Sequence, residues 1–278
     1  MTQEHNPVKK HHLTAAVQTA LMPARAEAAS DQPAADNQSP RSWYTINALA
    51  ASEPTVEIYI YDVIGYWGVS AQQFISDCKA AGVFSAKQIN LHIHSPGGDV
   101  MDGFAIYNTL ARLTCKIDIW NDGLAASMAS VILCLPNATV HMPSNAWVMI
   151  HKPWSGTVGN ADDLRDMADW LDRNEALLLN AYEKKTGKPR EELANLLSAD
   201  TWLDGLQAKE MGFVDVLEEP ISAAAYVNEN KMKDFNNIPT QARTLFGAKA
   251  NAGTAAPVPA NPTTTAVLPG QPQQPAGD

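Results

Sequence analysis

Cysteine is scarce in this chain of 278 residues, and its three cysteines form neither a disulfide framework nor a metal-binding set. Cys78, Cys115 and Cys134 lie far apart, and no CxxC or other zinc-type spacing relates them. Each lies in an apolar stretch, where cysteine usually serves as a small core residue. The histidines show no metal-ligand spacing with carboxylates nearby. The sequence therefore predicts no metal site, and its cysteine usage fits a reducing cytoplasm.

Long apolar runs and an excess of basic residues are also missing. No stretch approaches the roughly 18 apolar residues of a transmembrane helix, so no membrane partner is expected. Residues 13–22, after two lysines, match a signal peptide only weakly because polar residues interrupt them. Acidic residues outnumber basic ones, 30 to 20, for a formal net charge of -10. Such a chain repels a phosphate backbone, so nucleic acid is not an expected partner either.

Composition divides the chain into three parts. Residues 1–41 are rich in Ala, Gln, Asn, Asp and Pro without a sustained period, which predicts a disordered leader. Residues 42–220 have the size and the patterns of one folded domain. Residues 221–278 are expected to form a disordered tail, because prolines recur and charge is absent from 250 to 276.

Strand and helix patterns alternate through the central part, which predicts an α/β domain with a largely parallel sheet. Strands are predicted over residues 56–64, 88–94, 116–121, 138–142, 147–150 and 213–217. Helices are predicted over residues 99–113, 127–135 and 160–185, with further helices after Ser70, from Pro189 and from Asp204 to Met211. Gln73 is expected to complete a capping box with Ser70.

Three junctions after strands carry residues that can do chemistry. Residues 94–99 read His-Ser-Pro-Gly-Gly-Asp, where paired glycines can expose backbone N–H groups or simply form a turn. Ser127 stands at a helix start, where it is either an activated hydroxyl or a plain N-cap. The surrounding residues are not the GxSxG of α/β-hydrolases, because alanines replace both glycines. His151 ends an apolar strand, where a lone histidine is more often structural.

Together these segments, SPGGD, GLAASMAS and MIHKPW, resemble the Clp protease proteolytic subunit (ClpP) family. The resemblance runs from about residue 56 to residue 217, which is nearly the whole predicted domain. It is closest to the ClpP-related head maturation (prohead) proteases of tailed phages. Their pattern is echoed by SWY at 42–44, GFAIYN at 103–108, GNA at 159–161 and TWL at 201–203.

The resemblance implies a fold and a set of site residues. The fold is the ClpP/crotonase-like right-handed spiral of β-β-α units. The implied catalytic triad is Ser127 as nucleophile, His151 as base and Asp200 as acid, with Asp204 as the alternative acid or a simple helix cap. The backbone N–H groups of Gly98 and Met128 match the oxyanion hole.

The same resemblance implies a function and partners. It implies a serine endopeptidase that acts on proteins and peptides and needs no cofactor. The phage branch implies a head maturation protease that cleaves scaffold and itself, working in the host cytoplasm or the prohead, with scaffold and capsid proteins as partners. The alternatives are a housekeeping ClpP-type or signal-peptide-type peptidase, a crotonase-like acyl-CoA enzyme, or an inactive structural subunit.

Family members associate through the long helix, so a homo-oligomeric ring built partly on residues 160–185 is expected. Ring-forming housekeeping enzymes place an arginine before the catalytic acid. Ala199 occupies that position here, which puts the two-ring assembly in question.

Overall fold

The computed structural model describes residues 42–49, 54–65, 69–220 and 235–245. Contacts divide the chain into two compact units, 1–248 and 249–278, and every described residue belongs to the first. The predicted leader and most of the predicted tail lie outside the described residues. The strands are β1 (Tyr44–Leu49), β2 (Thr55–Ile60), β3 (Gln88–Ser95), β4 (Lys116–Ala126), β5 (Ala138–Pro143), β6 (Trp147–Ile150), β7 (Thr201–Asp204) and β8 (Val216–Glu218).

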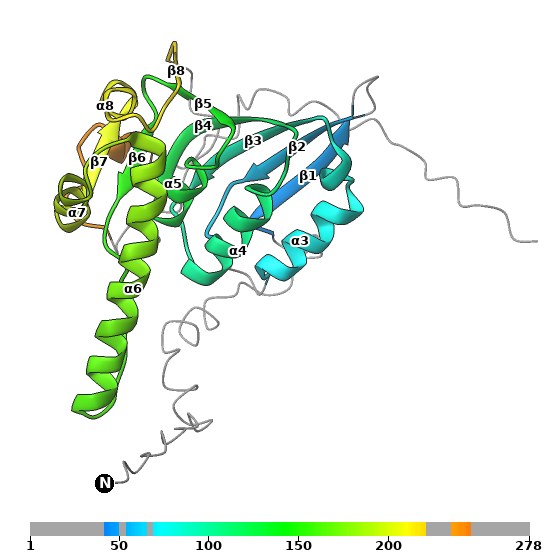
Figure 1. The fold of residues 1–278 in the computed structure, drawn as a ribbon. Coiled ribbons are helices and arrows are strands. Elements are labelled where there is room, and N and C mark those ends of the chain that lie inside the picture. Colours follow the sequence, from blue (N-terminus) through cyan, green and yellow to red (C-terminus); the bar gives the residue numbers. More distant parts are fainter. Residues whose placement is uncertain (1–41, 50–53, 66–68, 221–234, 246–278) are drawn as a thin grey trace, which may run out of the picture. The chain divides into compact units, whose positions relative to one another are not determined.

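The helices alternate with these strands along the chain (Figure 1). The α-helices are α3 (Ala71–Ala80), α4 (Val100–Leu110), α5 (Met128–Ile132), α6 (Ala161–Thr186), α7 (Arg190–Ser198) and α8 (Gly205–Met211). Two short 3-10 turns, η1 (Val83–Ser85) and η3 (Ala242–Leu245), complete the described elements.

All eight strands belong to one mixed sheet. Its main path runs β1-β2-β3-β4-β5-β8, and all neighbours along it are parallel except β1 and β2. A branch leaves β4, because β6 pairs parallel with the end of β4 and β7 pairs antiparallel with β6. The predicted α/β class with a largely parallel sheet is thus confirmed, and the branch is the part that positions the candidate site.

One face of the sheet is apolar and packed against helices. Alternate residues of the central strands, such as Ile58, Leu91 and Ile119, are fully buried there. They share a core with side chains of α3 and α4, including Phe74 and Ile106, and these helices lie in front of the sheet in Figure 1. Each such side chain contributes about 1.5–3 kcal/mol on burial, so this face provides most of the apolar core.

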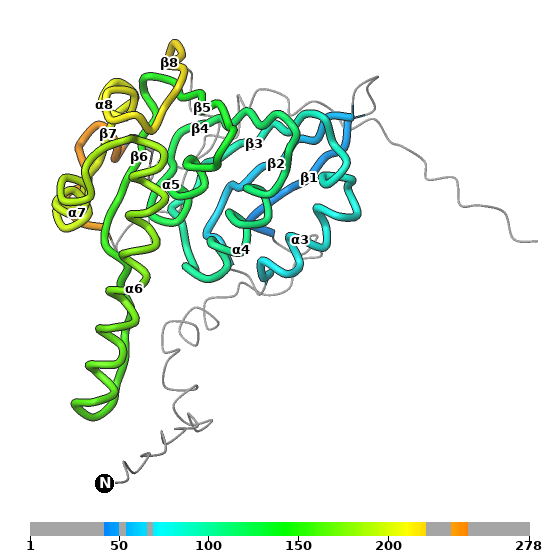
Figure 2. Tube along the Cα trace, viewed as in Figure 1, coloured from blue at the N-terminus to red at the C-terminus, as the bar shows by residue number. Residues whose placement is uncertain are grey.

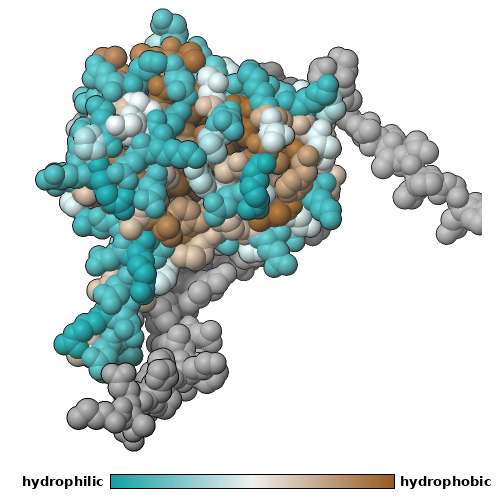
Figure 3. All heavy atoms as spheres, viewed as in Figure 1, coloured by the Kyte–Doolittle hydropathy of each residue, from teal (hydrophilic) through white to brown (hydrophobic). Residues whose placement is uncertain are grey.

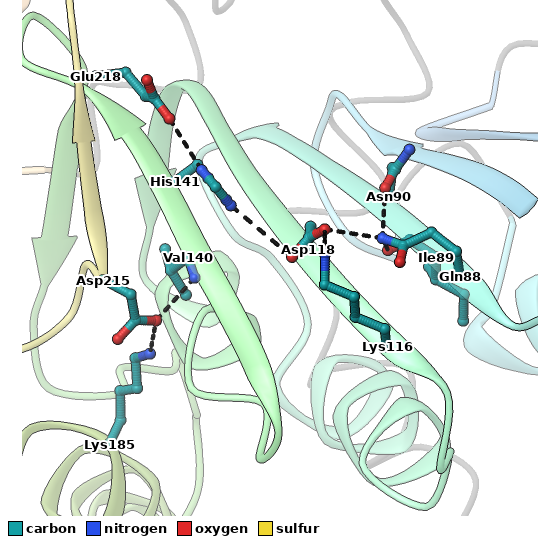
Figure 4. A network of polar contacts seen from close by, with 10 residues as sticks. All are labelled: Gln88, Ile89, Asn90, Lys116, Asp118, Val140, His141, Lys185, Asp215 and Glu218. Atoms are coloured by element: carbon teal, nitrogen blue, oxygen red, sulfur yellow. Dashed lines mark hydrogen bonds and ion pairs between the residues drawn. The ribbon is translucent and has the colours of Figure 1, made fainter.

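The opposite face carries a stacked row of rings instead. Tyr59, His92, Trp120 and His141 lie side by side on β2 to β5, with ring centroids 4.6, 6.4 and 4.1 Å apart in that order. Polar contacts extend from His141, at one end of this row (Figure 4), among them the pair between His141 and Glu218 at 3.0 Å. We call these four rings the ring row.

Several predicted boundaries needed correction. β4 continues past the Asp122-Gly123 pair to Ala126, because its last residues pair with β6. β1 and β7 were not predicted, since both are short and neither carries a clear alternation. Ser70 caps α3 as expected, but its capping box was wrong: the Gln73 side chain donates to Asp77 at 2.8 Å.

The long helix α6 is only half covered by the described residues. A capping box of Asn160 and Asp163 opens it, and its buried residues all lie in the second half. The first turns extend away from the sheet in Figure 1, and hydrophilic residues cover most of that part in Figure 3. Leu164, on the predicted apolar stripe, is 48% exposed. The stripe is therefore left partly open to solvent in the isolated chain.

Candidate active site

The register of the sheet brings three candidate residues to one edge. The pairs Ala126 with Met149 and Ile150 with Thr201 are the last ones of their ladders. Ser127, His151 and Asp200 each lie one residue beyond these paired positions. Strand ends that are neighbours in a sheet share an edge, so the three side chains converge although they lie far apart in sequence.

Ser127 occupies a strained turn between β4 and α5. Its φ of 52° and ψ of -125° are unfavourable for any residue with a side chain. The Ser127 N–H donates to the carbonyl of Met149 at 2.9 Å, which ties the turn to β6. A sharp strand-to-helix turn of this kind is also how α/β-hydrolases expose their nucleophile, here without the flanking glycines. The turn holds the hydroxyl at the edge of the sheet.

The Ser127 hydroxyl contacts His151. Its Oγ lies 2.8 Å from the Nε2 of His151. The hydroxyl makes no cap bond to the backbone of α5, so the plain N-cap alternative for Ser127 was wrong. A serine hydroxyl becomes a useful nucleophile only beside a base, and this contact supplies one.

The environment of His151 favours its neutral form. The residue is buried, and burial lowers its pKa, an effect that the negative charge of Asp200 partly opposes. A neutral imidazole can accept the serine proton at Nε2 if its own proton is on Nδ1. The geometry and the electrostatics both suit a general base.

Asp200 lies beside this histidine with a strained backbone of its own. Its φ is 50°, in the left-handed region that residues with a side chain seldom adopt. Its Oδ2 accepts a hydrogen bond from the Asn236 amide at 2.8 Å. Among the described residues, no hydrogen bond joins the Asp200 carboxylate to His151. The acid therefore acts on the base through its negative charge alone.

The glycine turn passes directly beside Ser127. Gly97 has a φ of +91°, and a Cβ built on it would lie 2.8 Å from both the Cβ of Ser127 and the N of Met128. A Cβ on Gly98 would lie 2.2 Å from the carbonyl oxygen of Ile64. Side chains are thus excluded from both positions by neighbouring backbone.

Two backbone N–H groups at this turn are available. The bridge to Ile64 uses the carbonyl of Gly97 at 2.8 Å and the N–H of Asp99 at 3.0 Å, which leaves the Gly98 N–H outside it. Met128 is the first residue of α5, where N–H groups have no intrahelical partner. These are the two donors that the family resemblance implies for an oxyanion hole.

Two other residues that could be taken as catalytic, Asp204 and Ser130, have structural roles instead. Asp204 caps α8 in a capping box with Gln207, at the far end of β7 from His151. Ser130 is fully buried and bonds to the Ser127 carbonyl at 2.6 Å and to the Tyr182 hydroxyl at 2.7 Å. Both residues thus have structural partners and lie outside the contact between Ser127 and His151.

Residues 235–245 form a part of this region that sequence reasoning missed. They were assigned to the tail, yet they run beside β7 in Figure 2, and Ala242 is fully buried. Phe235 packs on the ring of His151, with centroids 5.3 Å apart, and on Trp202 at 6.0 Å. One signal was present in the sequence: Phe235 and Ile238 stand apart from the Pro-rich composition that follows them.

The described part of the chain offers no candidate for a metal-binding cluster or for a membrane-spanning helix. Within residues 42–49, 54–65, 69–220 and 235–245, no three His, Cys, Asp or Glu side chains gather closely enough to hold a metal ion. None of the helices described is both long and apolar enough to cross a bilayer.

Comparisons with known proteins identify the family of the chain. The family model described as Clp protease matches residues 71–220, which is more than half of the chain. The ATP-dependent Clp protease proteolytic subunit of Dehalococcoides mccartyi strain 195 is 37% identical over 144 residues, 48% of this chain and 68% of the relative. The proteins of the same name from strains BAV1 and CBDB1 are each 36% identical over 144 residues, with the same coverage.

These matches confirm the ClpP/crotonase-like fold class and the serine-type peptidase assignment that the motifs implied. The match also spans the segments that carry Ser127, His151 and Asp200. The chain belongs to the Clp protease family and is a ClpP-type serine peptidase.

Proposed function

We propose that Ser127, His151 and Asp200 form the catalytic triad of this peptidase. The observation that carries the proposal is the 2.8 Å contact between Ser127 Oγ and His151 Nε2 at a strained strand-to-helix turn. In the reaction, Ser127 attacks the scissile carbonyl while His151 accepts its proton at Nε2. His151 then donates that proton to the leaving amine, and water resolves the acyl-enzyme by the same steps.

Asp200 completes the set by acting on the imidazole. A carboxylate opposite Nδ1 holds the tautomer that leaves Nε2 free to accept a proton, and it stabilises the imidazolium as it forms. The contact seen between Asp200 and Asn236 leaves the second carboxylate oxygen for this role.

The N–H groups of Gly98 and Met128 serve as the oxyanion hole. Both lie at the turn next to Ser127, and each donor is worth roughly 3–4 kcal/mol of transition-state stabilisation. No metal or organic cofactor takes part in these steps.

The triad is tested by labelling with a fluorophosphonate, which reacts with activated serines. The wild type should be labelled on Ser127, and Ser127→Ala should lose both labelling and peptide cleavage. Ser130→Ala is the matched control, since it removes a hydroxyl three residues away from the same helix. Label on Ser130, or label that survives Ser127→Ala, would contradict the assignment.

The finer role that we propose is phage head maturation, with cleavage of scaffold and of the chain itself. It is supported by the phage-type motifs at residues 103–108, 159–161 and 201–203. The site of action would be the host cytoplasm or the prohead, with scaffold and capsid proteins as substrates. The alternative is a housekeeping ClpP-type role, which the name of the Dehalococcoides relatives favours.

Intact mass separates these two roles. Wild type and Ser127→Ala are incubated for long times at high concentration. Self-processing predicts a shortened wild type, cut within residues 1–41 or beyond Glu219, beside a full-length mutant. Equal full-length masses, together with degradation of a folded substrate only when an ATP-driven unfoldase is added, would favour the housekeeping role.

A homo-oligomer, in the form of a ring, is the proposed assembly. The first half of α6 leaves Leu164 half exposed, and a partner chain can cover it. Leu164→Arg should sediment more slowly than the wild type, because the charge disrupts the assembly. Asp166→Arg, a charge change on an exposed residue of the same turns, is the control. A monomeric wild type at tens of micromolar would contradict the proposal.

A further inference from the structure

Residues 236 and 237 bind the chain on both sides of Asp200. Asn236 donates its amide N–H to the Asp200 carboxylate at 2.8 Å. Its own carbonyl accepts the indole N–H of Trp202 at 3.0 Å. Asn237 donates to the carbonyl of Ala199 at 3.1 Å. Three hydrogen bonds thus bracket one residue, and the central bond reaches the carboxylate itself.

The segment is also held by apolar packing. Phe235 packs against the rings of both His151 and Trp202. Ala242 is buried against the cluster that contains Leu124 and Met149. The side chain of Asn236 is exposed, but its backbone belongs to this packed segment and its carbonyl is held by the Trp202 indole.

Asp200 needs such a partner for two reasons. Its left-handed backbone is costly and has to be held by its surroundings. Its carboxylate can also rotate, and the described residues offer it a single side-chain hydrogen bond, on Oδ2. A donor fixed on one oxygen leaves the other oxygen to face Nδ1 of His151.

We propose that Asn236 is a positioning residue for the peptidase reaction, which orients the Asp200 carboxylate toward His151. The inference rests on the proposed triad, since it gives Asn236 a role only through Asp200. The opposite possibility is competition, in which Asn236 draws the acid away from the base. The two predict opposite signs, because loss of the amide slows catalysis in the first case and speeds it in the second.

The first test is kinetic. Asn236→Ala should lower kcat about 10-fold to 100-fold, with little change in KM. Losses of this size are typical when a residue that hydrogen-bonds to a site residue is removed. Asn237→Gly is the matched control, because it removes the neighbouring amide, which binds only backbone, and keeps the positive φ of 55° accessible. It should retain at least half of the wild-type kcat.

A double-mutant cycle then shows whether Asn236 acts through Asp200. In an Asp200→Asn background, Asn236→Ala should have no further effect on kcat. A general structural role would lower activity by the same factor in both backgrounds, and that result would overturn the proposal.

The pH profile of kcat/KM gives a second measurement, which a change in fold stability alone would not shift. Among the described residues, Asp200 is the charged group that shifts the pKa of His151. The neighbouring Lys152 is paired with Glu175 at 3.1 Å, so its charge is balanced. The charge of Asp200 raises the pKa of His151, so a misplaced carboxylate should shift the acid limb of kcat/KM to lower pH. Asn236→Ala should shift it in the same direction as Asp200→Asn, and by less.

The outcomes distinguish this inference from the triad. If Asp200→Asn is damaging while Asn236→Ala is neutral, the triad stands and the positioning role fails. Faster turnover of Asn236→Ala, with the acid limb moved to higher pH, establishes competition instead and also overturns the inference. If Ser127→Ala remains labelled and active, the proposed triad itself fails.

Discussion

The candidate site and the ring row both place a histidine beside acidic groups, yet the two histidines differ in chemistry. His92 in the ring row has both nitrogens occupied by carboxylates, Asp122 at 2.8 Å and Glu57 at 3.2 Å. Burial lowers its pKa, but the hydrogen bonds and charges of those two carboxylates outweigh burial and raise it. His151 meets a hydroxyl at Nε2, and its pKa is lowered by burial.

The comparison shows that the number of carboxylates around a histidine does not make it a catalytic base. Two carboxylates favour the protonated imidazolium and leave no nitrogen free to accept a proton. One carboxylate at a distance, with burial, keeps the imidazole neutral and leaves Nε2 for the serine. The candidate site thus has fewer carboxylates around its histidine than the ring row has around His92, and it is better suited to proton transfer.

The largest effect should separate the two histidines directly. His151→Ala is expected to lower kcat by roughly 10⁴-fold to 10⁶-fold, because members of a triad act as a unit. His92→Ala should leave kcat within about twofold, since His92 lies outside the site. Peptide hydrolysis by both purified variants gives the measurement, with circular dichroism to verify folding. A severe loss in His92→Ala would break the comparison.

The next effect concerns the acid. Asp200→Asn should lower kcat by roughly 10²-fold to 10⁴-fold, because the amide cannot stabilise the imidazolium. Asp204→Asn keeps a good helix cap and should retain most activity. Steady-state kinetics on both variants decides which carboxylate serves the reaction. The reverse ranking would move the acid to Asp204.

The pH dependence sharpens the comparison. Only neutral His151 can accept the serine proton, so kcat/KM should fall as pH drops through its pKa, which lies below the ordinary 6.5. Asp200 raises this pKa, so Asp200→Asn should move the acid limb to still lower pH. Profiles of wild type and variant in matched buffers test the direction, and a shift to higher pH would contradict it.

The last effect is one on stability rather than activity, at a third histidine. His94 is buried, and burial lowers its pKa to about 4, although Asp122 opposes the shift. The unfolded chain therefore binds a proton below about pH 6.5 that the folded chain resists. Stability should fall by about 3 kcal/mol between pH 6.5 and pH 4 from this residue.

Denaturant unfolding at pH 7 and pH 4.5 measures this loss, and His94→Phe should show it reduced. Comparing each variant with itself across pH removes any packing change that the substitution introduces. An equal acid loss in both proteins would show that other groups carry it.

Periodicity predicted the parallel part of the fold and the motifs supplied the proposed site residues, but neither revealed which strand pairings bring those residues together. Alternating apolar residues identify β2 and β3, and Asp204 marks the start of α8. The pairing of Ile150 with Thr201, which places Asp200 beside His151, depends on a short antiparallel strand with no sequence signal. Asn236 lies near a Pro-rich stretch, where composition hides a contact that only tertiary packing creates.

With Ser127 as the proposed nucleophile, its strained backbone sets stability and activity against each other. Its φ of 52° costs on the order of 1–3 kcal/mol, and glycine would relieve most of that cost. Variants selected for heat resistance alone should therefore accumulate glycine at position 127 and become inert. A screen that ranks homologues or designs by melting temperature would discard the active chain first, so a search for a hardier peptidase has to score turnover at every round.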